Sequence, residues 1–271
     1  MADPDKSLKP PANSVTLVDT RNWTMKIVGG LWLLLSLALL ANGFHQAIYV
    51  APTEATMGEV QRIFYYHVPS AIMGLIFPYV NLAGSLAYLY FRRSNPMKAQ
   101  AADALALAAA EVTLVFTTIG LVTGSLWARP AWGIWWAWDE RMTTYLLLWL
   151  LYVSYMLLRR FSASSGAGGA LNGSQTHTLA AVLSIFAGID VPIVYMSIRW
   201  WRTQHPSPVF FGGADSGLDP RMNTAFLWNI AAWFCWAVFL LGLRYSLERG
   251  RQCVERDAAL RELESSLQTS N

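Results

Sequence analysis

One stretch of the chain gathers four tryptophans and a carboxylate in eight residues between two long apolar segments. It reads Trp132-Gly133-Ile134-Trp135-Trp136-Ala137-Trp138-Asp139. Indole rings offer broad, flat, apolar surface with one polar N–H, so this density of tryptophan indicates a large, flat ligand. The alternative is an aromatic belt, since Trp and Tyr collect at both interfaces of a bilayer. A belt explains one or two of these residues, and four so close together favour a binding platform.

Two histidines stand beside further aromatic residues. His67 follows two tyrosines and precedes Pro69, which is tolerated in the first turns of a helix, so its imidazole would sit at a helix start. His205 follows the pair Trp200-Trp201. Neutral imidazole is a common iron ligand, and two imidazoles from opposite sides complete a six-coordinate, bis-histidine haem. Taken singly, His67 can also be an interfacial side chain and His205 a solvated loop residue.

Four arginines flank the aromatic residues, and they are Arg129, Arg141, Arg199 and Arg202. A guanidinium forms bidentate hydrogen bonds to carboxylates and also stacks on aromatic rings. Both properties suit haem, which has two propionates and a flat macrocycle. The arginines are therefore candidate contacts for the edges of such a ligand.

The spacing of the tryptophan segment predicts how its side chains point. Positions 132, 135, 136 and 139 follow an i, i+3, i+4, i+7 pattern, so on a helix lying in the interface these four residues would share one face. Trp138 would then point elsewhere. Asp139 is expected to accept a hydrogen bond from an arginine or from backbone N–H groups that hold the platform in shape. Because no second acid is paired with it, we predict no catalytic residue here.

Composition predicts the elements that position these residues. The chain has 271 residues, of which 54% are hydrophobic and 14% charged, as in a protein with several membrane spans. Each spanning helix needs about 20 apolar residues. Six segments qualify, at about 25–47, 63–91, 104–127, 142–160, 178–198 and 223–245. We therefore expect an all-α membrane protein with six transmembrane helices and a tryptophan-rich outer segment between the third and the fourth.

The distribution of Lys and Arg predicts the orientation. If the N-terminus is cytoplasmic, fourteen of these residues lie on the cytoplasmic side and six on the outer side, as the positive-inside rule requires. Both termini are then cytoplasmic. We expect a disordered cytoplasmic tail at 1–22, a six-helix domain at 23–246 and a charged cytoplasmic tail at 247–271. The small positive net charge of the chain, +3, follows from this excess of Lys and Arg on the cytoplasmic side. The sequence contains no nucleic-acid-binding motif.

This topology gathers the unusual residues on the outer face. His67, the tryptophan segment and His205 all fall there, close to or within connections between helices. His45, at the outer end of the first helix, competes for an iron-ligand role but has no adjacent aromatic cluster. His177 falls at the cytoplasmic start of the fifth helix, too far away to bind the same iron. The two cysteines form no Cys-x-x-Cys-His motif, so haem would not be held covalently.

With these motifs the chain resembles the CcmC group of cytochrome c maturation proteins, within a wider family of haem-handling proteins that share a tryptophan-rich (WWD) motif. The resemblance covers residues 23–246. Its motifs are Trp132-Gly133, Trp136, Trp138 and Asp139 at the family's spacing, His67-Val68-Pro69, and Trp200-Trp201 ahead of His205.

The resemblance implies a multi-pass protein of the bacterial cytoplasmic (inner) membrane that carries haem b as a transient cargo. His67 and His205 would be the axial ligands, and the tryptophan segment would be the outer platform. Haem would pass to a membrane-anchored periplasmic haem chaperone. The implied partners are an ABC-type ATPase and a small membrane subunit of the same pathway.

Other function classes make different demands on the chain. A haem permease needs a path through the bundle and two access states, and neither an inverted repeat nor a pair of broken helices is evident in the sequence. An enzyme that forms the haem thioether bond would resemble larger relatives with more spans. Glu111 and Asp190 lie within predicted spans, where a carboxylate is costly, so each is either a polar lock between helices or part of a proton or substrate path.

Overall fold

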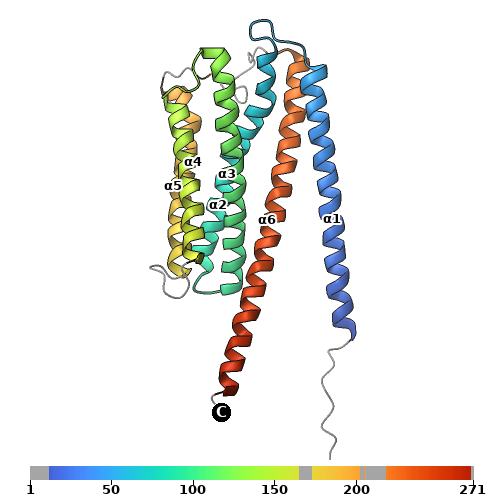
Figure 1. Ribbon diagram of the computed structural model, residues 1–271, viewed down its shortest axis with the longest axis vertical. Helices are drawn as coiled ribbons and strands as arrows, with labels where there is room; N and C mark the ends of the chain where they lie inside the picture. Colours follow the sequence, from blue (N-terminus) through green and yellow to red (C-terminus); the bar gives the residue numbers. More distant parts are fainter. Residues whose placement is uncertain (1–11, 165–172, 202–204, 206–217, 270–271) are drawn as a thin grey trace, which may run out of the picture.

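Six long helices make up most of the protein (Figure 1). The computed structural model describes residues 12–164, 173–201, 205 and 218–269. The helices are α1 (Ala12–His45), α2 (Phe64–Phe91), α3 (Pro96–Trp132), α4 (Glu140–Ser164), α5 (Gly173–Trp200) and α6 (Pro220–Thr269), with a short π-helix η1 (Gln46–Val50) and a 3-10 helix η2 (Glu59–Ile63) between the first two. All six are long and apolar enough to cross a membrane. The predicted all-α class with six spans is confirmed, and the described residues contain no strand beyond one isolated bridge.

The helices are arranged around the pair α2 and α3. On one side of this pair lie α4 and α5, and on the other lies α6, with α1 outermost (Figure 1). α1 packs mainly on α6 and on the adjoining η1. Its contacts with α6 include a hydrogen bond from Trp32 Nε1 to the carbonyl of Cys235 (3.1 Å) and one from Asn229 Nδ2 to the carbonyl of Gly43 (2.9 Å). Beyond these contacts, α1 leans away from α6 toward the chain's N-terminal end (Figure 1).

Small residues and buried polar groups hold α2 and α3 together. A Cβ built on Gly84 of α2 would lie 2.9 Å from the backbone nitrogen of Ala106 in α3, so glycine is required at this approach. Close backbone contact through small residues is the usual way for helices to pack in a membrane. Asn81 donates a hydrogen bond to the carbonyl of Ala106 (2.8 Å) and accepts one from Tyr152 of α4 (3.2 Å). This side chain therefore joins three helices inside the bundle.

The bundle has two ends, which we name by what lies there. The tryptophan face carries the η1–α2 connection, residues 133–139 between α3 and α4, and residue 205. The terminal face carries the α2–α3 turn at residues 92–95, the start of α1 and the end of α6 (Figure 1). Six spans return the chain to the face where it starts. The predicted placement of this face in the cytoplasm is a separate matter and stays a prediction.

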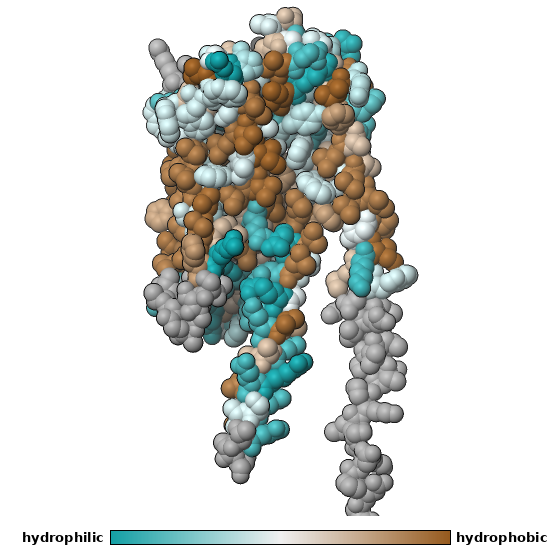
Figure 2. All heavy atoms as spheres, viewed as in Figure 1, coloured by the Kyte–Doolittle hydropathy of each residue, from teal (hydrophilic) through white to brown (hydrophobic). Residues whose placement is uncertain are grey.

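α6 is longer than the bundle and extends beyond the terminal face (Figure 1). Figure 2 shows apolar residues over the sides of the bundle and polar residues along the end of α6. The predicted C-terminal tail, 247–271, is thus largely the last part of this helix. Likewise α1 begins at Ala12, inside the segment predicted as an N-terminal tail.

The two intramembrane carboxylates have different surroundings. Glu111 of α3 pairs with Arg244 of α6, with 2.6 Å between Glu111 Oε1 and Arg244 Nη2, so it is a polar lock between helices. Asp190 of α5 is buried, and its Oδ2 atom has no hydrogen-bond partner among the described residues.

Candidate functional site

A glycine ends α3 and sets the course of the tryptophan segment. Gly133 adopts a left-handed conformation (φ 79°), and its N–H donates to the carbonyl of Arg129 (3.0 Å). Glycine favours this position because it has no Cβ to clash there. Residues 134–139 are consequently not helical, and the predicted helical face shared by Trp132, Trp135, Trp136 and Asp139 is wrong. The spacing was helical, but the turn at Gly133 separates Trp132 from the rest.

The tryptophans form two edge-to-face pairs instead. Trp132, at the end of α3, packs against Trp127 with ring centroids 5.2 Å apart, and Trp136 packs against Trp138 at 5.6 Å. Trp138 is 77% exposed and Trp135 is 57% exposed. The segment therefore presents two indole rings outward and supports one of them from behind with Trp136. The Nε1 atom of Trp136 is buried and has no hydrogen-bond partner among the described residues.

Asp139 joins this segment to α4. Its Oδ1 atom accepts a hydrogen bond from the backbone N–H of Met142 (2.8 Å), which is the N-terminal capping geometry that Asp favours. Of the two partners predicted for this carboxylate, the structure gives the backbone. The second oxygen is buried without a hydrogen-bond partner among the described residues, and the carboxylate interacts electrostatically with Arg141. Asp139 thus fixes where the tryptophan segment ends.

The ring of His67 is held in one orientation by α3. Its Nδ1 atom lies 3.0 Å from the hydroxyl oxygen of Thr123, and that hydroxyl lies 2.6 Å from the carbonyl oxygen of Ile119. A carbonyl only accepts, so the hydroxyl proton points to Ile119 and the hydroxyl oxygen accepts from His67 Nδ1–H. The Nε2 atom then carries the lone pair. A histidine that binds a metal usually donates its other N–H to such an acceptor, so this is the tautomer that an iron ligand needs.

Two glycines of α3 make room for the side chains beneath this site. A Cβ built on Gly124 would lie 3.0 Å from Cε1 of His67, and one built on Gly120 would lie 2.7 Å from the hydroxyl of Tyr145 in α4. Tyr145 is buried, and its hydroxyl has no hydrogen-bond partner among the described residues. These residues and Thr123 were not among the predicted site residues. The spacing of the two glycines, four residues apart in an apolar helix, is a known signal for close helix packing and could have indicated them.

Several predicted residues lie close enough to interact electrostatically. His67 interacts with the charges of His205 and Arg141, and Arg141 interacts in turn with Asp139 and Arg199. Residues from α2, from the start of α4, from the end of α5 and from position 205 therefore meet at the tryptophan face.

The other two predicted arginines are not part of this group. Arg129 is exposed and donates a hydrogen bond to the carbonyl of Gly133, so it supports the turn that ends α3. Arg202 lies outside the described residues.

Comparison with known proteins identifies the family. A family model described as CcmC, Heme exporter protein C, matches residues 13–259. The chain belongs to the CcmC family. The resemblance predicted from the tryptophan and histidine motifs is thereby confirmed.

The CcmC family chain is similar to bacterial and mitochondrial proteins. It is 37% identical to Heme exporter protein C of Bradyrhizobium diazoefficiens, over 66% of this chain and 62% of that protein. It is 32% identical to Heme exporter protein C of Escherichia coli (strain K12), over 73% of this chain and 75% of that protein. A putative cytochrome c biosynthesis ccmC-like mitochondrial protein of Marchantia polymorpha is 30% identical over 82% of this chain and 84% of its own length. The match to the Bradyrhizobium protein thus spans less than two thirds of that protein.

The geometry of this CcmC family member suits a haem that is held without covalent bonds. His67 offers a lone pair, Trp135 and Trp138 offer exposed flat surface, and Arg141 and Arg199 offer charge for carboxylates. The two remaining histidines lie elsewhere. His45 is exposed and packs on Tyr49 with ring centroids 5.6 Å apart, and His177 lies at the terminal face, hydrogen-bonded to Asp103 (2.7 Å).

Proposed function

We propose that this multi-pass membrane protein binds haem at the tryptophan face and delivers it to a membrane-anchored periplasmic haem chaperone for cytochrome c biogenesis. The names of its relatives, which refer to heme export and cytochrome c biosynthesis, support the general role. The single observation that carries the site is the orientation of His67, whose Nδ1–H is held by Thr123 while Nε2 is left with its lone pair. The cargo is haem b, which supplies an iron with two axial positions.

Each residue of the site has a distinct role in this proposal. His67 and His205 bind the iron from opposite faces in this proposal; its support is that they come from different elements and interact electrostatically. Trp132, Gly133, Trp135, Trp136 and Trp138 form the platform. Arg141 and Arg199 bind the propionates, and Arg129 and Arg202 are further candidate partners for them. Asp139 keeps the end of the platform in place through its cap on α4.

The proposal places the tryptophan face on the periplasmic side of the cytoplasmic membrane. The support is the charge distribution, since residues assigned to the terminal face carry fourteen of the twenty Lys and Arg residues. An acceptor in the periplasm then reaches the exposed Trp135 and Trp138 directly. The ABC-type ATPase would act from the cytoplasmic side, and the small membrane subunit within the bilayer.

The absorption spectrum of the detergent-purified protein tests the ligand assignment. Wild type, His67→Ala and His205→Ala are compared after supplementation with haem, with each spectrum scaled to folded protein. We expect a six-coordinate spectrum in wild type that is altered or lost in both variants. His45→Ala is the matched control, because its exposed ring lies against Tyr49, and it should leave the spectrum unchanged.

The same measurement separates the alternatives. A spectrum that changes in His45→Ala but not in His205→Ala would move one axial role to His45. If the wild-type protein binds no haem, the tryptophans are better explained as an ordinary interfacial belt, and a permease becomes the favoured function. Against a permease, all six helices run unbroken through the described part of the bundle, whereas transporters commonly use interrupted helices at their binding sites.

A further inference from the structure

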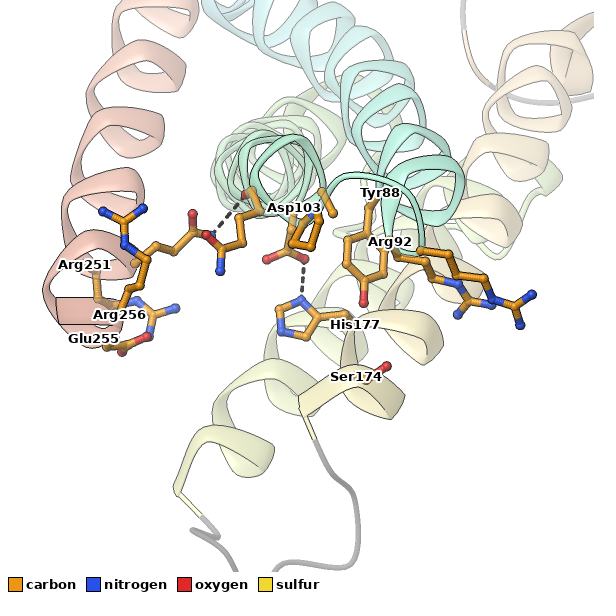
Figure 3. Close-up of a pocket in the computed structure, with 13 residues that line it drawn as sticks. Tyr88, Arg92, Asp103, Ser174, His177, Arg251, Glu255 and Arg256 are labelled. Atoms are coloured by element: carbon orange, nitrogen blue, oxygen red, sulfur yellow. Dashed lines mark hydrogen bonds and ion pairs between the residues drawn. The ribbon is translucent and has the colours of Figure 1, made fainter. Parts of the chain in front are cut away.

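A second polar site lies at the terminal face, at the opposite end of the bundle from the tryptophans. It is a groove of about 770 Å³ between the α2–α3 turn, the first turns of α5 and the extended part of α6. Figure 3 shows His177 and Asp103 at its centre, Arg251 and Arg256 on α6 at one side, and Tyr88 of α2 with Arg92 of the α2–α3 turn at the other. The proposed transfer of haem uses none of these residues.

A buried ion pair forms the floor of the groove. Asp103 of α3 accepts from Arg159 of α4 (2.8 Å between Asp103 Oδ2 and Arg159 Nη2), and both side chains are more than nine-tenths buried. The other carboxylate oxygen lies 2.7 Å from Nδ1 of His177. The same Nδ1 atom lies 3.0 Å from Nη1 of Arg159, so the three side chains form one cluster, and Nε2 of His177 points away from Asp103 (Figure 3). Tyr88 stacks on the imidazole at 5.5 Å and fixes its plane.

The negative charge of Asp103 is thus already matched inside the protein. It does not neutralise the arginines at the rim of the groove.

The charge at the rim is uneven. On α6, Arg251 forms ion pairs with Glu248 (2.6 Å) and Glu255 (2.5 Å), so its charge is matched. On the α2–α3 turn, Arg92 donates to the hydroxyl of Thr178 (2.9 Å), and neither Arg92 nor Arg93 forms an ion pair among the residues that the structure describes. Both arginines therefore line the groove without an ion-pair partner among the described residues. Ser174, in the first turn of α5, adds a hydroxyl beside them.

The groove lies where the apolar part of the bundle gives way to polar surface. α2 ends at Phe91 and α3 begins at Pro96, so we expect the turn that carries both unpaired arginines to lie at the depth of lipid headgroups. Exposed apolar side chains flank it, with Tyr90 77% exposed and Met97 49% exposed. A lipid supplies both a phosphate for the arginines and acyl chains for these side chains, whereas a free anion supplies only the first. Basic pockets between membrane helices on the cytoplasmic side are known to bind anionic headgroups.

We propose that the groove binds the phosphate headgroup of an anionic phospholipid, with Arg92 and Arg93 contacting the phosphate and Ser174 beside it. The arginines form charge-assisted hydrogen bonds to the phosphate oxygens. Their replacement should weaken binding by about fivefold per arginine, or about 30-fold for both.

Native mass spectrometry of the full-length, delipidated protein in detergent tests the proposal. Phosphatidylglycerol, phosphatidylcholine and inorganic phosphate are titrated separately onto wild type, Arg92→Gln/Arg93→Gln and a control pair, Arg160→Gln/Arg261→Gln. The control loses the same charge from exposed arginines that do not line the groove. We expect wild type to prefer phosphatidylglycerol, the groove variant to lose about 30-fold in affinity, and the control to bind as wild type does.

Three results would overturn the proposal. Equal affinity of wild type for the two lipids would mean that the headgroup charge is not recognised. An equal loss in the control pair would mean that any surface charge serves. Inorganic phosphate that binds wild type as tightly as the lipid does, and displaces it, would make the groove a site for free anions.

If the double variant unfolds at a lower temperature than wild type, the single variant Arg93→Gln is measured in its place. An affinity of Arg93→Gln for phosphatidylglycerol that is unchanged from wild type would then refute the proposal.

Discussion

Replacing Thr123 by valine tests the proposed orientation of His67 without touching a ligand. Valine keeps the shape of the side chain but has no hydroxyl, so the 3.0 Å contact with Nδ1 of His67 is lost. The imidazole is then free to rotate or to carry its proton on Nε2, and both changes lower the share of molecules in which the Nε2 lone pair is directed at the iron. Loss of a hydrogen-bond partner behind a metal ligand typically lowers metal affinity by about 10- to 100-fold. We expect a loss of this size, which corresponds to about 1.4–2.8 kcal/mol.

The assay is a titration of the haem-free protein with haem in detergent, followed by absorption. Thr117→Val is the matched control: Thr117 lies on the same helix, is buried, and donates to the carbonyl of Thr113 (2.8 Å) as Thr123 does to that of Ile119. It has no histidine partner among the described residues. If Thr123→Val binds haem as wild type does, or if the control loses as much, the hydrogen bond does not orient the ligand and the reasoning fails.

Three further predictions concern the packing around the site and the bundle. Gly124→Ala places a methyl group 3.0 Å from Cε1 of His67, so overpacking of about 1–3 kcal/mol should weaken haem binding in the same titration although the ligand is present. Asp139→Ala removes the cap of α4 and should lower the free energy of unfolding by about 0.5–2 kcal/mol, measured by denaturation in detergent. Glu111→Gln removes the negative charge that pairs with Arg244 and should cost about 1–3 kcal/mol in the same assay.

Each of these three predictions has its own control variant. Gly242→Ala adds a methyl group where no atom lies within 4 Å, so it should have no effect on haem binding, and an equal effect would remove the steric argument. Asp139→Asn keeps a capping side chain and should restore most of the stability; a loss as large as in the alanine variant would mean that the charge matters rather than the cap. Adding Arg244→Gln to Glu111→Gln should cost less than the sum of the single changes, and strict additivity would show that the pair does not interact.

The sequence predicted the class of fold well because the signal for membrane helices is strong and local. Six apolar segments became six helices, and a chain with six spans brings both ends to one face. The ends of the helices were predicted less accurately. The third span was predicted at about 104–127, whereas α3 covers Pro96–Trp132, because Asp103 interrupts the apolar run. Inside the protein that charge is paired with Arg159, so the helix continues through it.

The candidate site was predicted in part, since residue types indicate chemistry but not contacts. The aromatic, histidine and arginine residues stood out by composition. The structure places His67 within electrostatic reach of His205 and Arg141, and Arg141 within reach of Asp139 and Arg199. Their roles in haem binding stay predictions. The hydrogen bond from His67 to Thr123 could not be foreseen, because it depends on the register of α2 against α3. The helical face of the tryptophan segment was wrong because one glycine turn outweighed a helical spacing.

The packing of α1 against α6 has a consequence for the order in which the protein is made. About 175 residues separate the end of α1 from the start of α6, and at a synthesis rate of about 5–20 residues per second α6 follows α1 by roughly 9–35 s. During that time the first helix has been made and its main partner has not. Its surface suits this interval, because Leu31, Leu34, Leu35 and Leu37 are exposed in the finished protein and can meet lipid from the start. The hydrogen bonds that Trp32 and Gly43 make with α6 are therefore among the last to form, and they close the bundle between the first and the last helix of the chain.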